Sequence, residues 1–247
     1  DPTANTRILW KSDGTAAGTA QLAVGRLYNP RAPVLFGGRA FFSGDSGGGN
    51  NELWASDGTE AGTILVKEIR PTGLPSNPSF LTPAGARLYF AAVDGTSGTE
   101  LWASDGTEAG TTLVKDIWPG GSWSNPQNLT AVGSRVFFSA DDGVNGRELW
   151  VSDGTEAGTT LVKDLNPGGA SNPNYLAEMG GVLYFSANDP TGNWLYRSDG
   201  TAAGTYEVTK LTCTNPMYQT RVGGTLFFTG WTTTGWELCA SDGTSAG

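Results

Sequence analysis

The chain alternates short apolar runs with polar turns, most clearly between Ser124 and Leu165. Four segments there, 125–132, 135–140, 148–153 and 159–165, have the β-branched and aromatic content of strands. The residues between them are rich in Gly, Asp, Asn and Pro, which supply positive φ or a preset turn. No segment has a helical period of apolar residues long enough to favour a helix over a strand. The pattern predicts a unit of four short strands joined by turns.

This unit repeats along the chain. Glu52–Thr63 and Glu100–Thr111 are identical, and a Ser-Asp-Gly-Thr tetrapeptide recurs six times at intervals of 43 to 48 residues. Its aspartates are Asp13, Asp57, Asp105, Asp153, Asp199 and Asp242. A period of about 40 to 50 residues with four strands per unit is typical of propeller blades. We therefore predict an all-β fold, a β-propeller of about 48-residue four-stranded blades, forming one domain over residues 1–247.

Five intervals between six motifs favour five blades. The chain starts within one unit and ends within another, so both termini would contribute strands to the last blade. One copy of the third strand, either 7–13 or 237–242, is then surplus. Six blades, or a fragment of a longer array, are the alternatives.

The repeated "ELWASDGTEAGT" resembles the ELWxxDGT tandem-repeat family of bacterial, mostly exported proteins. The resemblance covers nearly the whole chain. It implies a repeat architecture and an extracytoplasmic setting, and no established activity or site residues. The terminal copies depart from the motif: the first lacks its Glu, and the last has Cys239 in place of Trp.

Composition narrows the choice of function. The chain has 15 Lys and Arg against 24 Asp and Glu, and its net charge of −9 comes without any basic run, so we expect no nucleic-acid partner. Histidine is absent, which removes the commonest general base and the Ser/His and Cys/His nucleophile arrangements. No apolar run is long enough to insert into a membrane. We expect a secreted or cell-surface protein.

Most repeated residues have a structural explanation. The third strand carries Trp10, Trp54, Trp102 and Trp150 at one position, with Tyr196 and Cys239 in the other copies. Burial between blades explains these residues better than stacking on sugars does. The Asp and Gly of the tetrapeptide suit a turn. Lys67, Lys115 and Lys163 would protect an open edge strand from pairing with other chains. The acidic residues recur with the period, so they do not form one asymmetric catalytic pair, and we expect no enzyme.

The departures from the repeat are the candidates for function. In an up-and-down blade the second-to-third-strand loops and the loops between blades lie at one end, and these are the variable loops. The candidate ligand-binding residues are Trp118, Trp123, Trp231, Trp236, Asn125 and Arg147. Asn77, Asn125, Asn172 and Asn215 each precede Pro at the start of a blade and would either cap the turn or contact a ligand.

These loops favour a non-catalytic, lectin-like module that binds carbohydrate or glycoconjugates at several sites. The alternative is a structural or adhesive cell-surface repeat protein that binds calcium or protein partners. A polysaccharide-active enzyme is the third choice.

Two local sites follow from the loops. We predict a disulfide between Cys213 and Cys239, which requires the loop holding Cys213 to fold over the second strand. Two separate buried thiols are the alternative. Asp94, Asp141 and Asp142 lie in Gly-rich turns whose oxygens suit calcium, although a calcium site needs about six to eight oxygens. Simple Asp-Gly turns are the alternative there, and we expect no other cofactor.

Overall fold

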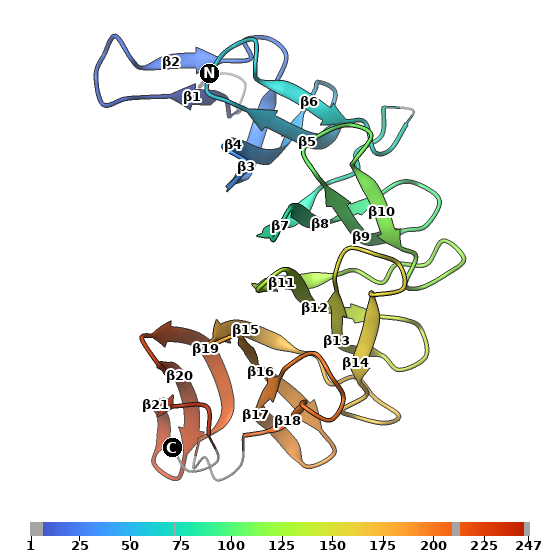
Figure 1. Cartoon of the computed structure of the whole chain (residues 1–247), viewed down its shortest axis with the longest axis vertical. Coiled ribbons are helices and arrows are strands. Elements are labelled where there is room, and N and C mark those ends of the chain that lie inside the picture. The colour runs from blue at the N-terminus through green and yellow to red at the C-terminus, as the bar shows by residue number, and fades with distance from the viewer. Residues whose placement is uncertain (1–6, 72, 209–212, 245–247) are drawn as a thin grey trace. The chain divides into compact units, whose positions relative to one another are not determined.

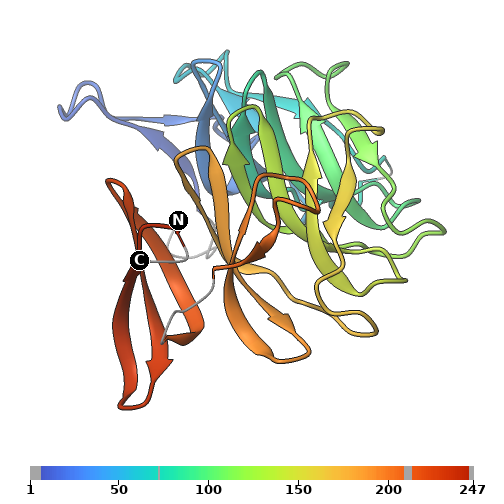
Figure 2. The ribbon, with the colours of Figure 1, turned by 60° about the horizontal axis from the view of Figure 1, so that its bottom comes forward.

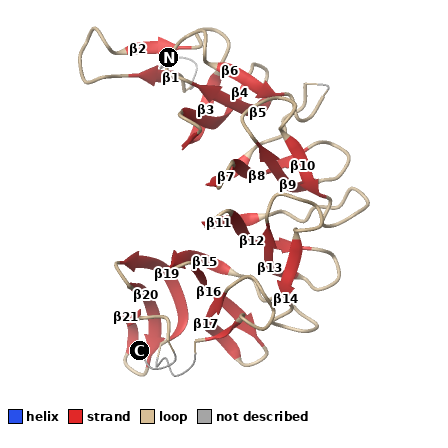
Figure 3. Cartoon of the chain, viewed as in Figure 1, coloured by secondary structure: helices blue, strands red, loops and turns tan. Residues whose placement is uncertain are grey.

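The computed structural model describes residues 7–71, 73–208 and 213–244 (Figure 1). All regular elements in these ranges are β-strands (Figure 3), arranged as six antiparallel sheets. The described residues accordingly contain no helix capable of crossing a membrane. The chain divides into two compact units, unit 1 at residues 1–123 and unit 2 at residues 124–247.

Unit 1 contains one two-stranded and two four-stranded sheets. Its strands are β1 (Leu9–Lys11), β2 (Ala20–Leu22), β3 (Tyr28–Phe36), β4 (Arg39–Asp45), β5 (Asn51–Ser56), β6 (Ile64–Lys67), β7 (Ser79–Ala84), β8 (Arg87–Val93), β9 (Thr99–Ser104) and β10 (Thr112–Lys115). The four-stranded sheets are β3 to β6 and β7 to β10, and in both the strands follow one another in chain order.

Unit 2 contains two four-stranded sheets and a final three-stranded sheet. Its strands are β11 (Gln127–Val132), β12 (Arg135–Asp141), β13 (Arg147–Ser152), β14 (Thr160–Lys163), β15 (Asn174–Met179), β16 (Val182–Asp189), β17 (Gly192–Ser198), β18 (Tyr206–Glu207), β19 (Thr214–Val222), β20 (Thr225–Thr232) and β21 (Gly235–Ser241). The strands of this final sheet are drawn in red in Figure 2. The predicted fold class is confirmed, whereas the number of blades, ring closure and the single domain stay predictions.

Successive side chains of the third strand pack into hydrophobic clusters on opposite faces of the sheet. Leu53 and Ala55 on β5 pack in one cluster with Trp102 of the following sheet. Trp54, between them, packs in another cluster with Leu27. This is the period of two expected where both faces of a strand are buried. Trp102 therefore joins the two four-stranded sheets of unit 1.

The core role predicted for the repeated third-strand position is confirmed in five of its six copies. Trp54, Trp102, Trp150, Tyr196 and Cys239 are 4 to 7% exposed. The prediction is wrong for Trp10, which is 55% exposed. Its strand β1 belongs to a two-stranded sheet, and no sheet precedes it in the described chain to cover the indole.

The tetrapeptide forms a turn closed by its own hydrogen bonds. Asp57 Oδ1 accepts from the Thr59 N–H (2.8 Å) and the Thr59 hydroxyl (2.7 Å), and Thr59 Oγ1 accepts from the Gly62 N–H (2.9 Å). The Ser56 and Thr63 hydroxyls bond across the loop at 2.8 Å. A Cβ on Gly62 would overlap the Asp57 carboxylate, so only glycine fits. The hydrogen bonds from Thr59 lower the pKa of Asp57, and the predicted turn is confirmed.

The strand lysines have partners that the sequence did not indicate. Lys67 Nζ donates to the carbonyl oxygens of Thr111 (2.7 Å) and Glu108 (3.3 Å), in the turn of the following sheet. Lys163 Nζ donates to the Thr205 carbonyl at 3.0 Å. Both lysines lie on edge strands of their sheets, so protection of the edge stays a prediction. Their ammonium groups also satisfy carbonyl groups of the following sheet.

A buried glutamate fixes the loop that leads from one sheet to the next. Glu52 is 0% exposed and accepts from the Ile69 N–H (2.9 Å) and the Ser76 hydroxyl (2.6 Å). Burial raises its pKa, although these hydrogen bonds oppose the rise. The Val93 N–H, at the end of β8, donates to the Ser76 carbonyl at 2.9 Å. The two kinds of variable loop therefore meet at one end of the sheet, as predicted.

Candidate functional site

One pair of residues differs in all five larger sheets while the strands around it repeat. It is the ladder pair of the second and third strands whose third-strand member directly precedes the repeat position of Glu52, at the base of the variable hairpin. The five pairs are Asp45 with Asn51, Val93 with Thr99, Asp141 with Arg147, Asn188 with Asn193, and Trp231 with Trp236. We call this position the hairpin-base pair. Variable residues at the end of a repeated scaffold are typical of ligand-contacting sites.

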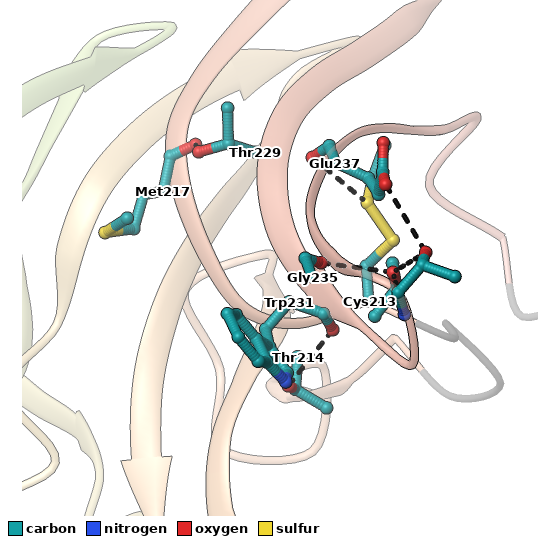
Figure 4. Close-up of a disulfide and its surroundings, with 10 residues drawn as sticks. Cys213, Thr214, Met217, Thr229, Trp231, Gly235 and Glu237 are labelled. Atoms are coloured by element: carbon teal, nitrogen blue, oxygen red, sulfur yellow. Dashed lines mark hydrogen bonds between the residues drawn. A yellow bond between two sulfur atoms is a disulfide. The ribbon is translucent and has the colours of Figure 1, made fainter.

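In the last sheet the hairpin-base pair is aromatic and exposed. Trp231 and Trp236 are 49% and 51% exposed, and their rings meet edge to face with centroids 5.7 Å apart and planes at 81°. The Thr214 hydroxyl donates to the Trp231 carbonyl at 3.3 Å (Figure 4). Two rings at this angle present an apolar corner at the rim of the sheet.

Polar groups border this corner. The Thr234 hydroxyl donates to Glu237 Oε1 at 3.3 Å, and the hydroxyls of Thr232 and Thr234 are 3.0 Å apart. The hairpin thus combines a large apolar surface with directional donors and acceptors.

The predicted disulfide lies beside the tryptophan pair. Cys213 and Cys239 are bonded, with their Cα atoms 6.6 Å apart (Figure 4). Strand β20 passes beneath the bridge at Gly230, where a Cβ would lie 2.8 Å from the Cβ of Cys213 and 3.3 Å from the sulfur of Cys239. The loop therefore folds over the second strand, as predicted, and glycine is needed because the bridge approaches so closely.

The bridge replaces an apolar contact found in the first four-stranded sheet. In repeat register, Cys213 and Cys239 correspond to Leu27 and Trp54, which share a core cluster. A Cβ on Gly44, the counterpart of the glycine beneath the bridge, would meet both Leu27 and Trp54. The sequence alone does not show this equivalence, because Leu27 lies in an irregular segment.

The other predicted ligand residues are differently placed. Trp118 is half-buried and Trp123 is 60% exposed, and both belong to unit 1. Asn125 and Arg147 belong to unit 2, where Arg147 Nη1 donates to the carbonyl oxygens of Asn125 (2.9 Å) and Ser139 (3.1 Å). Burial lowers the pKa of Arg147. Its guanidinium group is thus engaged by the protein's own carbonyls.

The predicted calcium ligands cap turns. Asp94 Oδ1 accepts from the Thr96 and Ser97 N–H groups at 2.7 and 2.8 Å. Asp141 and Asp142 likewise accept from backbone N–H groups of their own turn. Within the described ranges, no three His, Cys, Asp or Glu side chains gather into a metal-binding group. This geometry is that of the Asp-Gly turn alternative, and calcium binding stays a prediction.

The Asn-Pro dipeptides introduce a backbone feature that the sequence did not reveal. Asn77 and Asn172 have φ of 49°, and their N–H groups donate to the carbonyls of Asn51 (3.1 Å) and Arg147 (3.0 Å) in the preceding sheet. Asn29, which also precedes Pro, has the same φ. Three residues after the Asn of each of the five dipeptides, a second non-glycine residue has positive φ: Ala32, Phe80, Asn128, Tyr175 and Tyr218. Bulky residues rarely adopt this conformation, so no sequence signal marks it.

Comparison with known proteins supports the fold and nothing finer. No protein-family model and no curated protein matches the chain. A puromycin hydrolase crystal structure is similar at a TM-score of 0.58 and 15% identity, over 96% of this chain and 41% of that one. A Mycobacterium tuberculosis puromycin-hydrolyzing peptidase is similar at a TM-score of 0.58 and 11% identity, over 90% of this chain and 37% of that one. The computationally designed Ika8 protein is similar at a TM-score of 0.50 and 16% identity, over 88% of this chain and 63% of that one.

The chain spans about two fifths of the length of the two hydrolases. At these identities the likeness concerns the fold alone. Together with the repeated four-stranded meanders, it defines the chain as a repeat protein with the blade fold of β-propellers.

Proposed function

We propose that the protein is a non-catalytic, secreted or cell-surface module that binds carbohydrate in a lectin-like manner. The observation that carries the proposal is the hairpin-base pair, which differs in every larger sheet and becomes the exposed Trp231–Trp236 corner in the last. A sugar ring needs an apolar plate and a few directional hydrogen bonds. Repetition of the loop-bearing end along the chain would let weak sites gain affinity by multivalency.

The acidic residues and the disulfide support this proposal. The Asp57 carboxylate is engaged in its own turn, and the Glu52 carboxylate is buried against N–H and O–H donors. Neither is presented as a general acid or base. The disulfide suits the oxidising compartments in which secreted and cell-surface proteins fold.

A glycan array probed with the full chain tests the function, with calcium and with EDTA. We expect binding to saccharides that Trp231→Ala and Trp236→Ala weaken at least tenfold while leaving the unfolding midpoint nearly unchanged. Trp10→Ala is the matched control, since Trp10 is also exposed but lies on β1. Absence of binding to any saccharide overturns the proposal. Binding lost in EDTA supports the calcium prediction, and hydrolysis of a bound glycan supports the enzyme alternative.

A further inference from the structure

Each unit has a pocket between two consecutive sheets, beside the Asn-Pro dipeptide. The pocket of unit 1 has a volume of about 280 Å³, and that of unit 2 about 270 Å³. Equivalent repeat positions line them: Ser43, Asn51 and Asn77 in unit 1 correspond to Ser186, Asn193 and Asn215 in unit 2. A pocket formed twice from the same positions is a property of the repeat.

The β11–β14 sheet shows what such a pocket accepts. There the position of Asn51 and Asn193 is taken by Arg147, whose Nη1 donates to the carbonyl oxygens of Asn125 and Ser139. The corresponding carbonyls in the pocket of unit 2 belong to Asn172 and Ser186. A side chain with several N–H donors thus occupies this position in one sheet, and the two sheets that form the pockets carry the short amides of Asn51 and Asn193 in its place.

The pocket of unit 2 is neutral and rich in amides. Its lining has no charged side chain. Asn193 Nδ2 donates to Asn188 Oδ1 at 3.0 Å, so Asn188 keeps its two amide hydrogens and Asn193 its oxygen for other partners. Tyr175 lies at the rim, and its ring contacts that of Tyr218 with centroids 5.0 Å apart. Tyr218 is 65% exposed.

We infer that these two pockets are saccharide subsites, each holding one sugar residue of a neutral glycan. Sugar hydroxyls donate to the carbonyls equivalent to those that Arg147 contacts in its own sheet and accept from the Asn amides, while Tyr175 in unit 2 and Phe80 in unit 1 supply apolar contact. In unit 2 the neutral amides suit a neutral ligand because its binding leaves no unpaired buried charge. The pocket of unit 1 has one charged lining residue, Arg31, which is exposed to solvent. The inference rests on the proposed carbohydrate binding and adds a second kind of site, separate from the tryptophan corner.

Exchange of residues between repeat copies provides the test. Asn51→Arg gives the β3–β6 sheet an Asp-Arg pair like Asp141–Arg147 of the β11–β14 sheet. Conversely, Arg147→Asn gives the β11–β14 sheet an Asp-Asn pair like Asp45–Asn51 of the β3–β6 sheet. Each change therefore installs a pair that the fold already accommodates elsewhere. Asn193→Arg fills the pocket of unit 2 in the same way.

Isothermal titration calorimetry of the full chain with cellotriose, mannotriose and chitotriose measures the outcome. We expect one fewer site per chain in Asn51→Arg and in Asn193→Arg, and one more in Arg147→Asn. Trp231→Ala should leave the pocket sites unchanged. Equal unfolding midpoints of parent and variants show that folding is not responsible.

The remaining outcomes separate the two proposals. If the parent binds these sugars but the exchanges leave the stoichiometry unchanged, the inference is overturned and the proposed function stands. If no trisaccharide binds the parent, both fail. If an acetylated, amidated Gly-Ser hexapeptide binds the pockets and the sugars do not, the assigned ligand class is wrong.

Discussion

The ammonium group of Lys67 donates a hydrogen bond to the carbonyl oxygen of Thr111, 2.7 Å away and 44 residues further along the chain. Lys163 and Thr205 form the same link in unit 2, at 3.0 Å. The last strand of one sheet is thereby tied to the turn of the next. The link lies between the apolar clusters and solvent, because Lys67 and Thr111 are half-buried and buried, respectively.

Lys67→Met tests this link, since methionine keeps most of the stem and removes the donor. A hydrogen bond to a charged group contributes about 1.5 to 3 kcal/mol, and partial exposure of Lys67 places the expected loss near the lower value. Urea unfolding measures it. Lys11→Met on the exposed strand β1 is the control and should change the free energy of unfolding by less than about 0.5 kcal/mol. Equal effects of the two variants would contradict the assigned role.

The tryptophans of the third strand should differ sharply in their contribution to stability. Trp102→Ala is expected to lower the free energy of unfolding by about 3 to 5 kcal/mol, because it empties a buried aromatic site. Trp10→Ala should lower it by less than about 1 kcal/mol, because the indole is already 55% exposed. Thermal unfolding followed by near-UV circular dichroism compares the two. A similar loss in both would show that the Trp10 indole is buried in solution.

Gly62→Ala tests the close approach of the turn backbone to the Asp57 carboxylate. The added methyl would displace that carboxylate and break its bonds to Thr59, so we expect destabilisation of about 1 to 3 kcal/mol. In the background of Asp57→Ala the same change should be nearly neutral, and a double-mutant cycle measures the difference. Gly224→Ala is the control, since its Cβ would meet no atom within 4 Å.

Glu148 should make stability depend on pH. Burial raises its pKa above the ordinary value of 4.5. Below pH 4.5 the group is protonated in both the folded and unfolded states, and stability falls as the pH rises through the folded-state pKa. The free energy of unfolding of the parent, relative to Glu148→Gln, should therefore decrease as the pH rises above 4.5. Urea unfolding of both proteins over a series of pH values measures this difference, and a flat difference would contradict the prediction.

Removal of the Cys213–Cys239 bridge should cost about 2 to 4 kcal/mol, measured as a lower melting temperature of the Cys213→Ser, Cys239→Ser double variant. The double variant Cys213→Leu, Cys239→Trp should recover part of this loss. It recreates over Gly230 the contact that Leu27 and Trp54 make over Gly44. A leucine–tryptophan variant no more stable than the serine variant would show that the two sites are not equivalent.

The structural features that recur in every repeat could be predicted from the sequence. Four strands per unit, the buried third-strand aromatics and the turn at each aspartate follow from a period that any single copy could not reveal. The disulfide was predictable because only two cysteines exist and both fall in one unit. The need for glycine at position 230, beneath the disulfide, could not be predicted, because nothing in the sequence distinguishes Gly230 from other glycines in variable segments.

Contacts between copies were not predictable, because they depend on how far a side chain reaches across to the next sheet. The bonds of Lys67 and Lys163 to carbonyl groups are of this kind. The positive φ of Phe80 and Tyr175 is contrary to residue preference, so tertiary packing imposes it. The pockets beside the Asn-Pro dipeptides were missed because they require two sheets to be seen together.

Neighbouring sheets within unit 1 carry both halves of their connection: Trp102 packs onto the sheet before its own, and Lys67 bonds to the turn of the sheet after its own. A duplicated segment of the gene would therefore encode a sheet that fits between its neighbours without any new surface having to evolve. The variable hairpins, with their hairpin-base pairs, would then remain free to diverge. Changes in repeat number and changes in ligand contacts can thus arise by separate mutations, the first by unequal recombination and the second by point substitution.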